Sequence, residues 1–129
     1  MIVEKPWGKV TTYTLNQTAS VRMITIDAGQ TTSEHYHQLR DEMWVVLDEG
    51  LVIQIGNRVV EARLGEEFVV ASEEPHRISN RGERRGRVLE IAHGYTTEDD
   101  TFRLQDEYGR PLESEWQTGP PAGEDPLRG

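Results

Sequence analysis

The sequence predicts an all-β domain, either a sandwich or a barrel. Short segments rich in β-branched and aromatic residues recur along the chain and alternate with turns that contain Gly or Asn. No long segment places apolar residues at the 3.6-residue spacing of an amphipathic helix. The length of 129 residues and the apolar content of 35% suit one domain with a modest core.

The expected strands follow one another at short intervals. They cover residues 9–15, 21–27, 31–37, 42–47, 51–55, 59–62, 68–70, a strand that starts at 76, and 87–93. The dipeptide Gly56-Asn57 predicts a two-residue hairpin turn. Residues 21–27 carry apolar side chains on both faces, which indicates cover on both sides, as in a sandwich or a subunit contact. Trp7 and Trp44 are expected to line the core.

The character of the chain changes after Gly94. Residues 96–100 (TTEDD) are typical of a helix cap with acidic first-turn residues, and residues 101–108 are expected to form a short helix or an ordered extension. Residues 111–129 contain four of the six prolines and several acids, so we expect an extended or disordered tail there. The predicted organisation is one domain over residues 1–110 followed by this tail.

Composition narrows the classes of partner. A net charge of −9 argues against a nucleic-acid or anionic-membrane partner, because binding to phosphate groups depends on basic residues. The chain has no cysteine, so neither disulfides nor thiolate chemistry are available. No apolar stretch resembles a signal-peptide core or a membrane span, and we therefore expect a cytoplasmic protein.

Two blocks of the sequence contain metal-ligand residue types. The first places His35 and His37 two residues apart, which directs both imidazoles to one face of a strand, and Glu42 follows a short polar bend. The second block, residues 65–80, contributes His76. Three neutral imidazoles and one carboxylate are a ligand set for a divalent metal, with zinc first and manganese, iron or nickel as alternatives.

The spacing in these blocks resembles the two motifs of the cupin family. The first block has Gly29, five residues, His35-Tyr36-His37, four residues and Glu42. The second block has Gly65, then His76, three residues and Asn80, with Ala71 and Glu73 in place of the proline and the glycine of the family motif. The resemblance implies a double-stranded β-helix, which is a jelly-roll-like barrel, with a short C-terminal extension.

A closer resemblance is to the type II mannose-6-phosphate isomerase domain of the cupins. The matching segments are EKPWG at 4–8, RDEMWVV at 40–46, PHRISN at 75–80 and EDDTFRLQDEYGR at 98–110. The resemblance covers about residues 3–110, as a stand-alone chain. It implies metal-assisted interconversion of an aldose phosphate and a ketose phosphate, such as mannose 6-phosphate and fructose 6-phosphate.

The resemblance also implies roles for residues outside the metal ligands. It places Arg110 in a catalytic role, and it makes Lys5 and Arg40 candidates for contacts to phosphate or sugar hydroxyls. His93 shares strand parity with Leu89 and Ile91 and is expected to point inward, either as a core histidine or as a proton-transfer group beside the metal.

Other functions and substrates stay open at this point. The first ligand position is glutamine in much of the resembled family, where this chain has His35. A related sugar or sugar phosphate is therefore an alternative substrate. An iron-dependent oxygenase and a non-catalytic sugar or small-molecule binding protein are alternative functions. We expect a homodimer, and exchange of an N-terminal strand between subunits is compatible with the exposed start of the chain.

Overall fold

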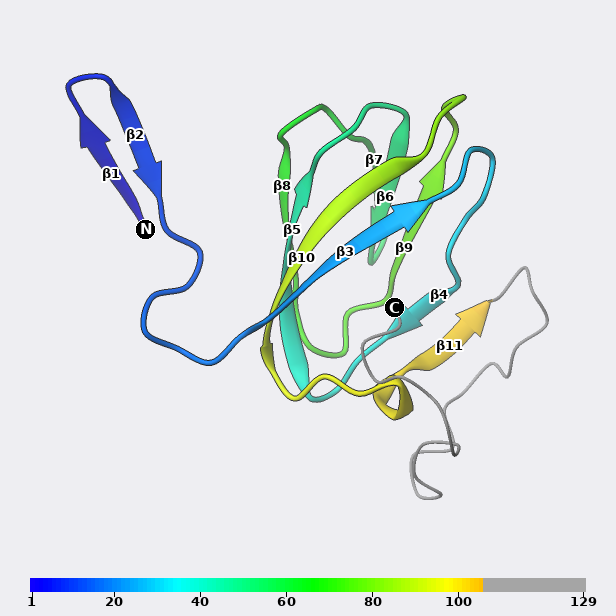
Figure 1. Cartoon of the computed structure of the whole chain (residues 1–129). Helices are drawn as coiled ribbons and strands as arrows, with labels where there is room; N and C mark the ends of the chain where they lie inside the picture. Colours follow the sequence, from blue (N-terminus) through cyan, green and yellow to red (C-terminus); the bar gives the residue numbers. More distant parts are fainter. Residues whose placement is uncertain (106–129) are drawn as a thin grey trace.

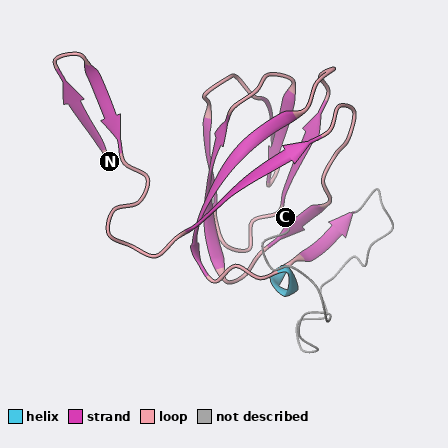
Figure 2. Cartoon of the chain, in the orientation of Figure 1, coloured by secondary structure: helices cyan, strands magenta, loops and turns pink. Residues whose placement is uncertain are grey.

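Two antiparallel sheets form the body of the protein in the computed structural model, which describes residues 1–105 (Figures 1 and 2). One sheet has the order β3 (Ser20–Ile26), β10 (Gly86–Gly94), β5 (Arg40–Val46) and β8 (Glu67–Val70). The other has the order β11 (Phe102–Gln105), β4 (Glu34–Tyr36), β9 (His76–Asn80), β6 (Leu51–Ile55) and β7 (Arg58–Glu61). The all-β prediction is confirmed. Within residues 1–105, no helix is long and apolar enough to cross a bilayer.

The space between the two sheets holds an apolar core and a polar region. Strand β5 shows the alternation that creates both, because Arg40, Glu42, Trp44 and Val46 are buried whereas the residues between them are less so. The apolar part contains Trp44, Val46, Leu51, Ile53, Phe68, Val70, Ile78 and Val88. The buried polar residues include His37, Arg40, Glu42, His76 and Glu90. Such groups need hydrogen-bond or charge partners inside the fold.

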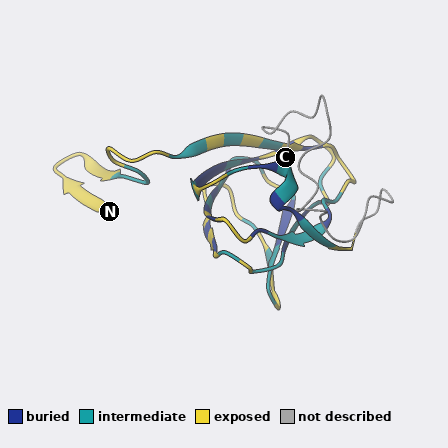
Figure 3. Cartoon of the chain, turned by 90° about the horizontal axis from the view of Figure 1, so that it is seen from below, coloured by how far each residue is buried: buried dark blue, intermediate teal, exposed yellow. Residues whose placement is uncertain are grey.

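The N-terminal residues form a separate hairpin rather than part of the core. Strands β1 (Ile2–Lys5) and β2 (Gly8–Thr11) pair only with each other, and they stand away from the barrel in two perpendicular views (Figures 1 and 3). The side chain of Trp7 is 74% exposed. The expectation that Trp7 lines the core is wrong, because the turn that carries it projects into solvent; the same expectation for Trp44 is confirmed.

The other turns follow the sequence closely, with one exception. Strands β6 and β7 are joined by Gly56-Asn57, and Gly56 has φ +58°, which glycine adopts without steric cost. After Gly94, a single 3-10 turn, η1 (Glu98–Asp100), begins at Thr97, whose hydroxyl accepts from the Asp99 amide. Residues 102–105 form strand β11, which pairs with β4 as an edge strand, so the short-helix alternative is wrong for residues 101–105; residues 106–108 lie outside the described residues.

Asn80 joins both sheets at one end of the barrel. Its side-chain amide donates to the backbone carbonyls of Ile26 and Arg84 at 2.9 and 2.8 Å, and its carbonyl oxygen accepts from the Gly82 amide at 2.9 Å. Because Asn80 is almost fully buried, water cannot replace these hydrogen bonds.

We predict that Asn80→Ala lowers the free energy of unfolding by about 2–4 kcal/mol, because it leaves the buried carbonyl of Ile26, the carbonyl of Arg84 and the amide of Gly82 without their side-chain partner. Urea denaturation of the variant measures the loss. Gln17→Ala, at an exposed position, is the matched control and should change stability by less than about 0.5 kcal/mol. A loss below 1 kcal/mol at Asn80 would contradict this role.

Candidate metal centre

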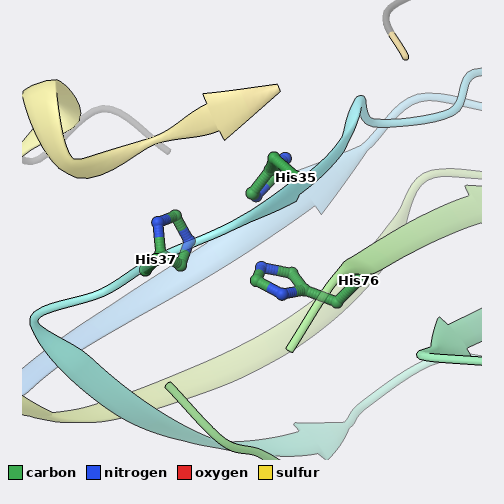
Figure 4. A group of neighbouring side chains, drawn as sticks. All are labelled: His35, His37 and His76. Carbon is green, nitrogen blue, oxygen red and sulfur yellow. The ribbon is translucent and has the colours of Figure 1, made fainter. Parts of the chain in front are cut away.

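Three histidines from two neighbouring strands gather at one point between the sheets (Figure 4). His35 of β4 lies directly opposite His76 of β9 in the antiparallel ladder, so the two rings share one face and their centroids are 4.5 Å apart. His37 follows the end of β4 with the same parity, and its ring lies 5.0 Å from each of the others. One ring nitrogen from each histidine lies within 4.8 Å of the other two.

Each imidazole is oriented by a hydrogen bond at Nδ1. His37 donates to the carbonyl of Asp100 at 2.7 Å, and His76 donates to the carbonyl of Glu74 at 2.9 Å. Because a carbonyl can only accept, these two rings carry their proton on Nδ1 and present the Nε2 lone pair. Nδ1 of His35 lies 2.6 Å from the hydroxyl of the buried Ser33. Hydrogen bonds of this kind orient histidines that bind metal ions.

The electrostatic environment keeps all three rings neutral, as metal binding requires. Burial lowers the pKa of His35 well below its usual value, and the neighbouring imidazoles add to the effect. Burial, together with the Arg40 guanidinium, lowers the pKa of His37 to about 3. Burial also lowers the pKa of His76. The donor set therefore fits a divalent metal such as zinc.

Glu42, the fourth predicted ligand, lies beside this group and is held by other partners. Its two carboxylate oxygens accept from Arg40 Nε at 2.7 Å and from Trp44 Nε1 at 2.8 Å. One of these oxygens is 3.3 Å from Nε2 of His37, which also accepts from Arg40 Nη2 at 3.0 Å. Among residues 1–105, the cluster of mutually close ligand atoms contains only the histidines. Metal coordination by Glu42 stays a prediction. It requires that the Arg40 side chain move away from the Glu42 carboxylate.

The histidines open into a cavity of about 440 Å³ that also contains three arginines. Arg22 donates through Nε and Nη2 to one oxygen of Glu90, at 3.0 and 2.8 Å. Arg103 is the ladder partner of His35 and donates to Glu98 at 3.3 Å, but its buried Nε has no hydrogen-bond partner among residues 1–105. Burial and the Glu42 carboxylate raise the pKa of Glu90 to about 7.

The segment between β4 and β5 is held by an acidic residue from a distant part of the chain. The carboxylate of Asp100 accepts from the backbone amides of Gln38 and Leu39 at 3.0 and 2.9 Å, while its own carbonyl accepts from His37. Asp100 is 1% exposed. This residue therefore positions His37 and the backbone that leads to Arg40.

Sequence reasoning missed several residues of this site. It gave no role to Arg22 or Glu90, although the parity of Glu90 with Val88 could have shown that it faces inward. Arg103 and Asp100 lie in the EDDTFR run, which was noted only as part of a motif. No local signal shows that Asp100 contacts residues about sixty positions earlier.

The structure does not bring every predicted residue to the cavity. The predicted inward orientation of His93 is wrong, because His93 pairs with Asp41 on the face of β10 opposite to the cavity, whereas Ala92 pairs with Glu42. Lys5 lies in the exposed N-terminal hairpin, away from the barrel (Figure 1). Arg40 does line the cavity. Arg110 and the tail at 111–129 lie outside the described residues.

Solved structures share this architecture, which is the double-stranded β-helix fold of the cupins. A cupin protein from Bacteroides fragilis aligns with a TM-score of 0.53 and 22% identity, over 62% of this chain and 74% of its own. A double-stranded β-helix protein from Klebsiella pneumoniae aligns with a TM-score of 0.54 and 18% identity, over 59% of this chain and 67% of its own. The predicted double-stranded β-helix is confirmed.

Residues 1–106 match the family described as mannose-6-phosphate isomerase C-terminal, and the chain belongs to that family. The xanthan biosynthesis protein XanB of Xanthomonas campestris pv. campestris is 30% identical over 109 residues, which is 84% of this chain. A mannose-1-phosphate guanylyltransferase of Klebsiella pneumoniae is 33% identical over 110 residues, again 84% of this chain. The chain spans 23% of the length of each of these relatives.

We predict that the metal-free protein binds one equivalent of Zn²⁺ or Co²⁺ at the three histidines, as measured by calorimetry and by the visible spectrum of the cobalt form. His76→Gln should weaken binding at least about 100-fold, because it removes one of three imidazoles. His93→Gln is the matched control and should bind as the parent protein does, since His93 lies on the opposite face. Equal weakening in both variants would contradict the site.

A second prediction concerns pH. Because the three imidazoles stay neutral in the folded metal-free protein and take up protons in the unfolded chain below about pH 6.5, the free energy of unfolding should fall as the pH is lowered from 6.5. The loss is at most about 1.4 kcal/mol per pH unit for each imidazole. The raised pKa of Glu90 acts in the opposite direction between about 4.5 and 7, but it is one group against three.

Urea titrations of the metal-free protein at several pH values between 7.5 and 4.5 measure this slope. His37→Gln should reduce it, since the pKa of His37 is lowered to about 3. Gln17→Ala, which changes no titratable group and lies at an exposed position, should leave it close to the parent value. Stability that does not change between pH 6.5 and 4.5 would show that the rings are not protected from protons in the folded state.

Proposed function

We propose that the protein is a metal-dependent aldose–ketose isomerase that acts on a phosphorylated sugar, with mannose 6-phosphate and fructose 6-phosphate as the first pair to test. The observation that carries the proposal is the placement of three neutral imidazoles and three arginines around one cavity. Family membership agrees with it. A candidate sugar phosphate isomerase from Acidithiobacillus ferrooxidans has the same fold, with a TM-score of 0.55, 22% identity, and coverage of 63% of this chain and 53% of its own.

The reaction requires a proton to move between C1 and C2 of an open-chain sugar. Removal of that proton leaves negative charge on the sugar oxygens, and a divalent metal would supply Lewis-acid stabilisation of this charge when bound. The residues that would hold the metal are His35, His37 and His76. Glu42 is a further candidate if the substrate or the metal displaces Arg40.

Glu90 is our candidate for the proton-transfer residue. It is buried in the wall of the cavity, and its pKa of about 7 allows it both to accept and to release a proton near neutral pH. Arg22 donates to Oε1 of Glu90 through Nε at 3.0 Å and Nη2 at 2.8 Å, and thereby fixes the orientation of the carboxyl group. The carboxyl group would take the proton from one carbon and return it to the next.

Arg103 is our candidate for the phosphate contact. Its guanidinium is mostly buried, is paired with Glu98 through Nη2, and retains a buried Nε–H with no partner within residues 1–105. A phosphate oxygen is a strong acceptor for such a donor. The side chain starts at the ladder position opposite His35, so a phosphate bound by Arg103 would lie next to the candidate metal. Arg40 and, beyond the described residues, Arg110 remain candidates for substrate contacts.

We predict that the protein loaded with zinc or manganese converts mannose 6-phosphate to fructose 6-phosphate, as followed by a coupled assay or by NMR. Glu90→Gln should lower kcat by about 100-fold or more while metal binding is retained, because it removes the proton acceptor but keeps the shape of the side chain. Arg103→Gln should mainly raise KM for the phosphorylated sugar, with little effect on metal binding.

His93→Gln is the control for this assay and should retain activity. If the metal-loaded protein binds sugar phosphates but does not convert them, the function is binding rather than isomerisation. Oxygen uptake that depends on added iron would favour an oxygenase. The buried arginines argue for the isomerase among these three, since an oxygenase has no need of fixed cations for phosphate.

A further inference from the structure

The guanidinium of Arg40 contacts two of the four predicted metal ligands. Its Nη2 donates to Nε2 of His37 at 3.0 Å, and its Nε donates to Oε2 of Glu42 at 2.7 Å. These two acceptor atoms lie 3.3 Å apart, so one planar group of fixed donors spans both of them. Arg40 is 5% exposed, and both contacts are therefore made inside the barrel, away from bulk water.

A metal ion and Arg40 cannot use the His37 ring at the same time. Nδ1 of His37 carries the proton and donates to the carbonyl of Asp100, so Nε2 is the one ring nitrogen with a lone pair to offer. That lone pair accepts from Arg40 Nη2. Metal binding through all three histidines therefore requires the hydrogen bond between Arg40 and His37 to break, whether or not Glu42 also becomes a ligand.

The positive charge of Arg40 also opposes a second cation among the rings. Burial is the main cause of the lowered pKa of His35, His37 and His76, and the Arg40 guanidinium contributes to the lowering at all three. A charge that disfavours a proton on each ring also disfavours a divalent metal between the rings, because the metal carries twice the charge of a proton. Arg40 is therefore an internal competitor of the metal.

A displaced Arg40 needs a new anionic partner, because a buried charge that loses its partner is strongly destabilising. Its side chain lines the cavity, so the new partner must be reached there. Apart from Glu42, each acid that lines the cavity in the described part of the chain already contacts another arginine: Glu90 with Arg22, Glu98 with Arg103, and Asp27 with Arg85. An anionic ligand in the cavity would supply the missing partner, since charged oxygens are the strongest acceptors for a guanidinium.

We propose that Arg40 couples metal binding to the binding of a phosphate monoester. Without the metal it bridges His37 and Glu42; with the metal it turns towards the interior of the cavity and donates to the phosphate. The metal and the phosphate then bind with positive cooperativity, and each strengthens the binding of the other by the same factor. This coupling rests on the metal and the phosphate of the proposed function, but it does not depend on turnover.

Calorimetric titration of the metal-free full chain with Co²⁺, with and without saturating sorbitol 6-phosphate, tests the coupling. This probe is a phosphate monoester without a carbonyl group, so it cannot be isomerised. The parent protein should bind cobalt at least about 5-fold more tightly with the probe than without it, as is typical of coupled sites. Sorbitol, which lacks the phosphate, should have no such effect. In the reciprocal titration, the probe should bind the cobalt-loaded parent more tightly than the metal-free parent by the same factor.

Two variants separate Arg40 from arginines in general. Arg40→Met removes the guanidinium and keeps an unbranched side chain. Without the probe it should bind cobalt at least about 10-fold more tightly than the parent does, and the effect of the probe on cobalt binding should fall below about 2-fold. Arg87→Met is the matched control, because Arg87 also donates through Nε to a carboxylate, that of Asp48 at 2.8 Å, but on the protein surface. It should match the parent in both titrations.

Three outcomes would overturn the coupling. Weaker cobalt binding by Arg40→Met would mean that Arg40 supports the metal site rather than competes with the metal. An equal effect of the probe on the parent and on Arg40→Met would place the phosphate contact elsewhere. Equal binding of the probe to the cobalt-loaded and metal-free parent, a comparison that needs no variant, would show that no coupling exists. Coupling in a protein that does not convert mannose 6-phosphate would support this role of Arg40 and reject only the isomerase.

Discussion

The register between β4 and β9 is the constraint on which the candidate site depends. Because side chains alternate between the faces of a strand, a shift of one residue would turn His35 away from His76. Polar contacts beside the pair, between the residues before His35 and those after His76, hold this register. The hydroxyls of Thr31 and Ser79 lie 2.7 Å apart, and the Ile78 amide donates to the Thr32 hydroxyl at 3.0 Å. The register and the hydrogen bonds between these two strands thus determine how closely the imidazoles approach each other.

Charge balance is the second constraint on the cavity. Each of its three arginines contacts one acid: Arg22 with Glu90, Arg40 with Glu42, and Arg103 with Glu98. Buried charges of this kind are stable only when they are paired and hydrogen-bonded. Burial works to raise the pKa of Glu42, whereas the Arg40 guanidinium, whose Nε lies 2.7 Å from the carboxylate, works to lower it, and the net effect is a lowered pKa. A bound cation and a bound phosphate would enter this cavity as a pair of opposite charges, which keeps the balance.

The sequence was a good guide where function and local periodicity agree. The parity of Glu42, Trp44 and Val46 and that of His76 and Ile78 are both as expected, since each strand places its buried residues at alternate positions. His93 was misplaced because parity with the apolar Leu89 and Ile91 was taken to mark the inside. In this sheet the inside near the cavity is polar, so the usual inference from apolar character to burial gives the wrong face.

Other features depend on contacts that no local pattern reveals. The hydrogen bonds of Asp100 to the segment before Arg40 join residues that are about sixty positions apart, and the pairing of Arg103 with His35 requires β11 to lie beside β4. The hairpin at the N-terminus was expected as a bend before one strand. Residues 2–5 pair with residues 8–11 through backbone hydrogen bonds. From the sequence alone, the intervening Pro6-Trp7 is equally compatible with a bend and with a hairpin turn.

Strand β10 forms part of the cavity wall beside the candidate metal centre. Its residues Val88, Glu90 and Ala92 face the interior, where Glu90 must be polar if the cavity is to handle charge. On the opposite face Ile91 is only 5% exposed and Leu89 is half-buried, so the single chain already covers much of both faces of this strand. A strand with both faces covered also keeps its backbone hydrogen bonds away from water on either side, and this favours a rigid wall beside the histidines.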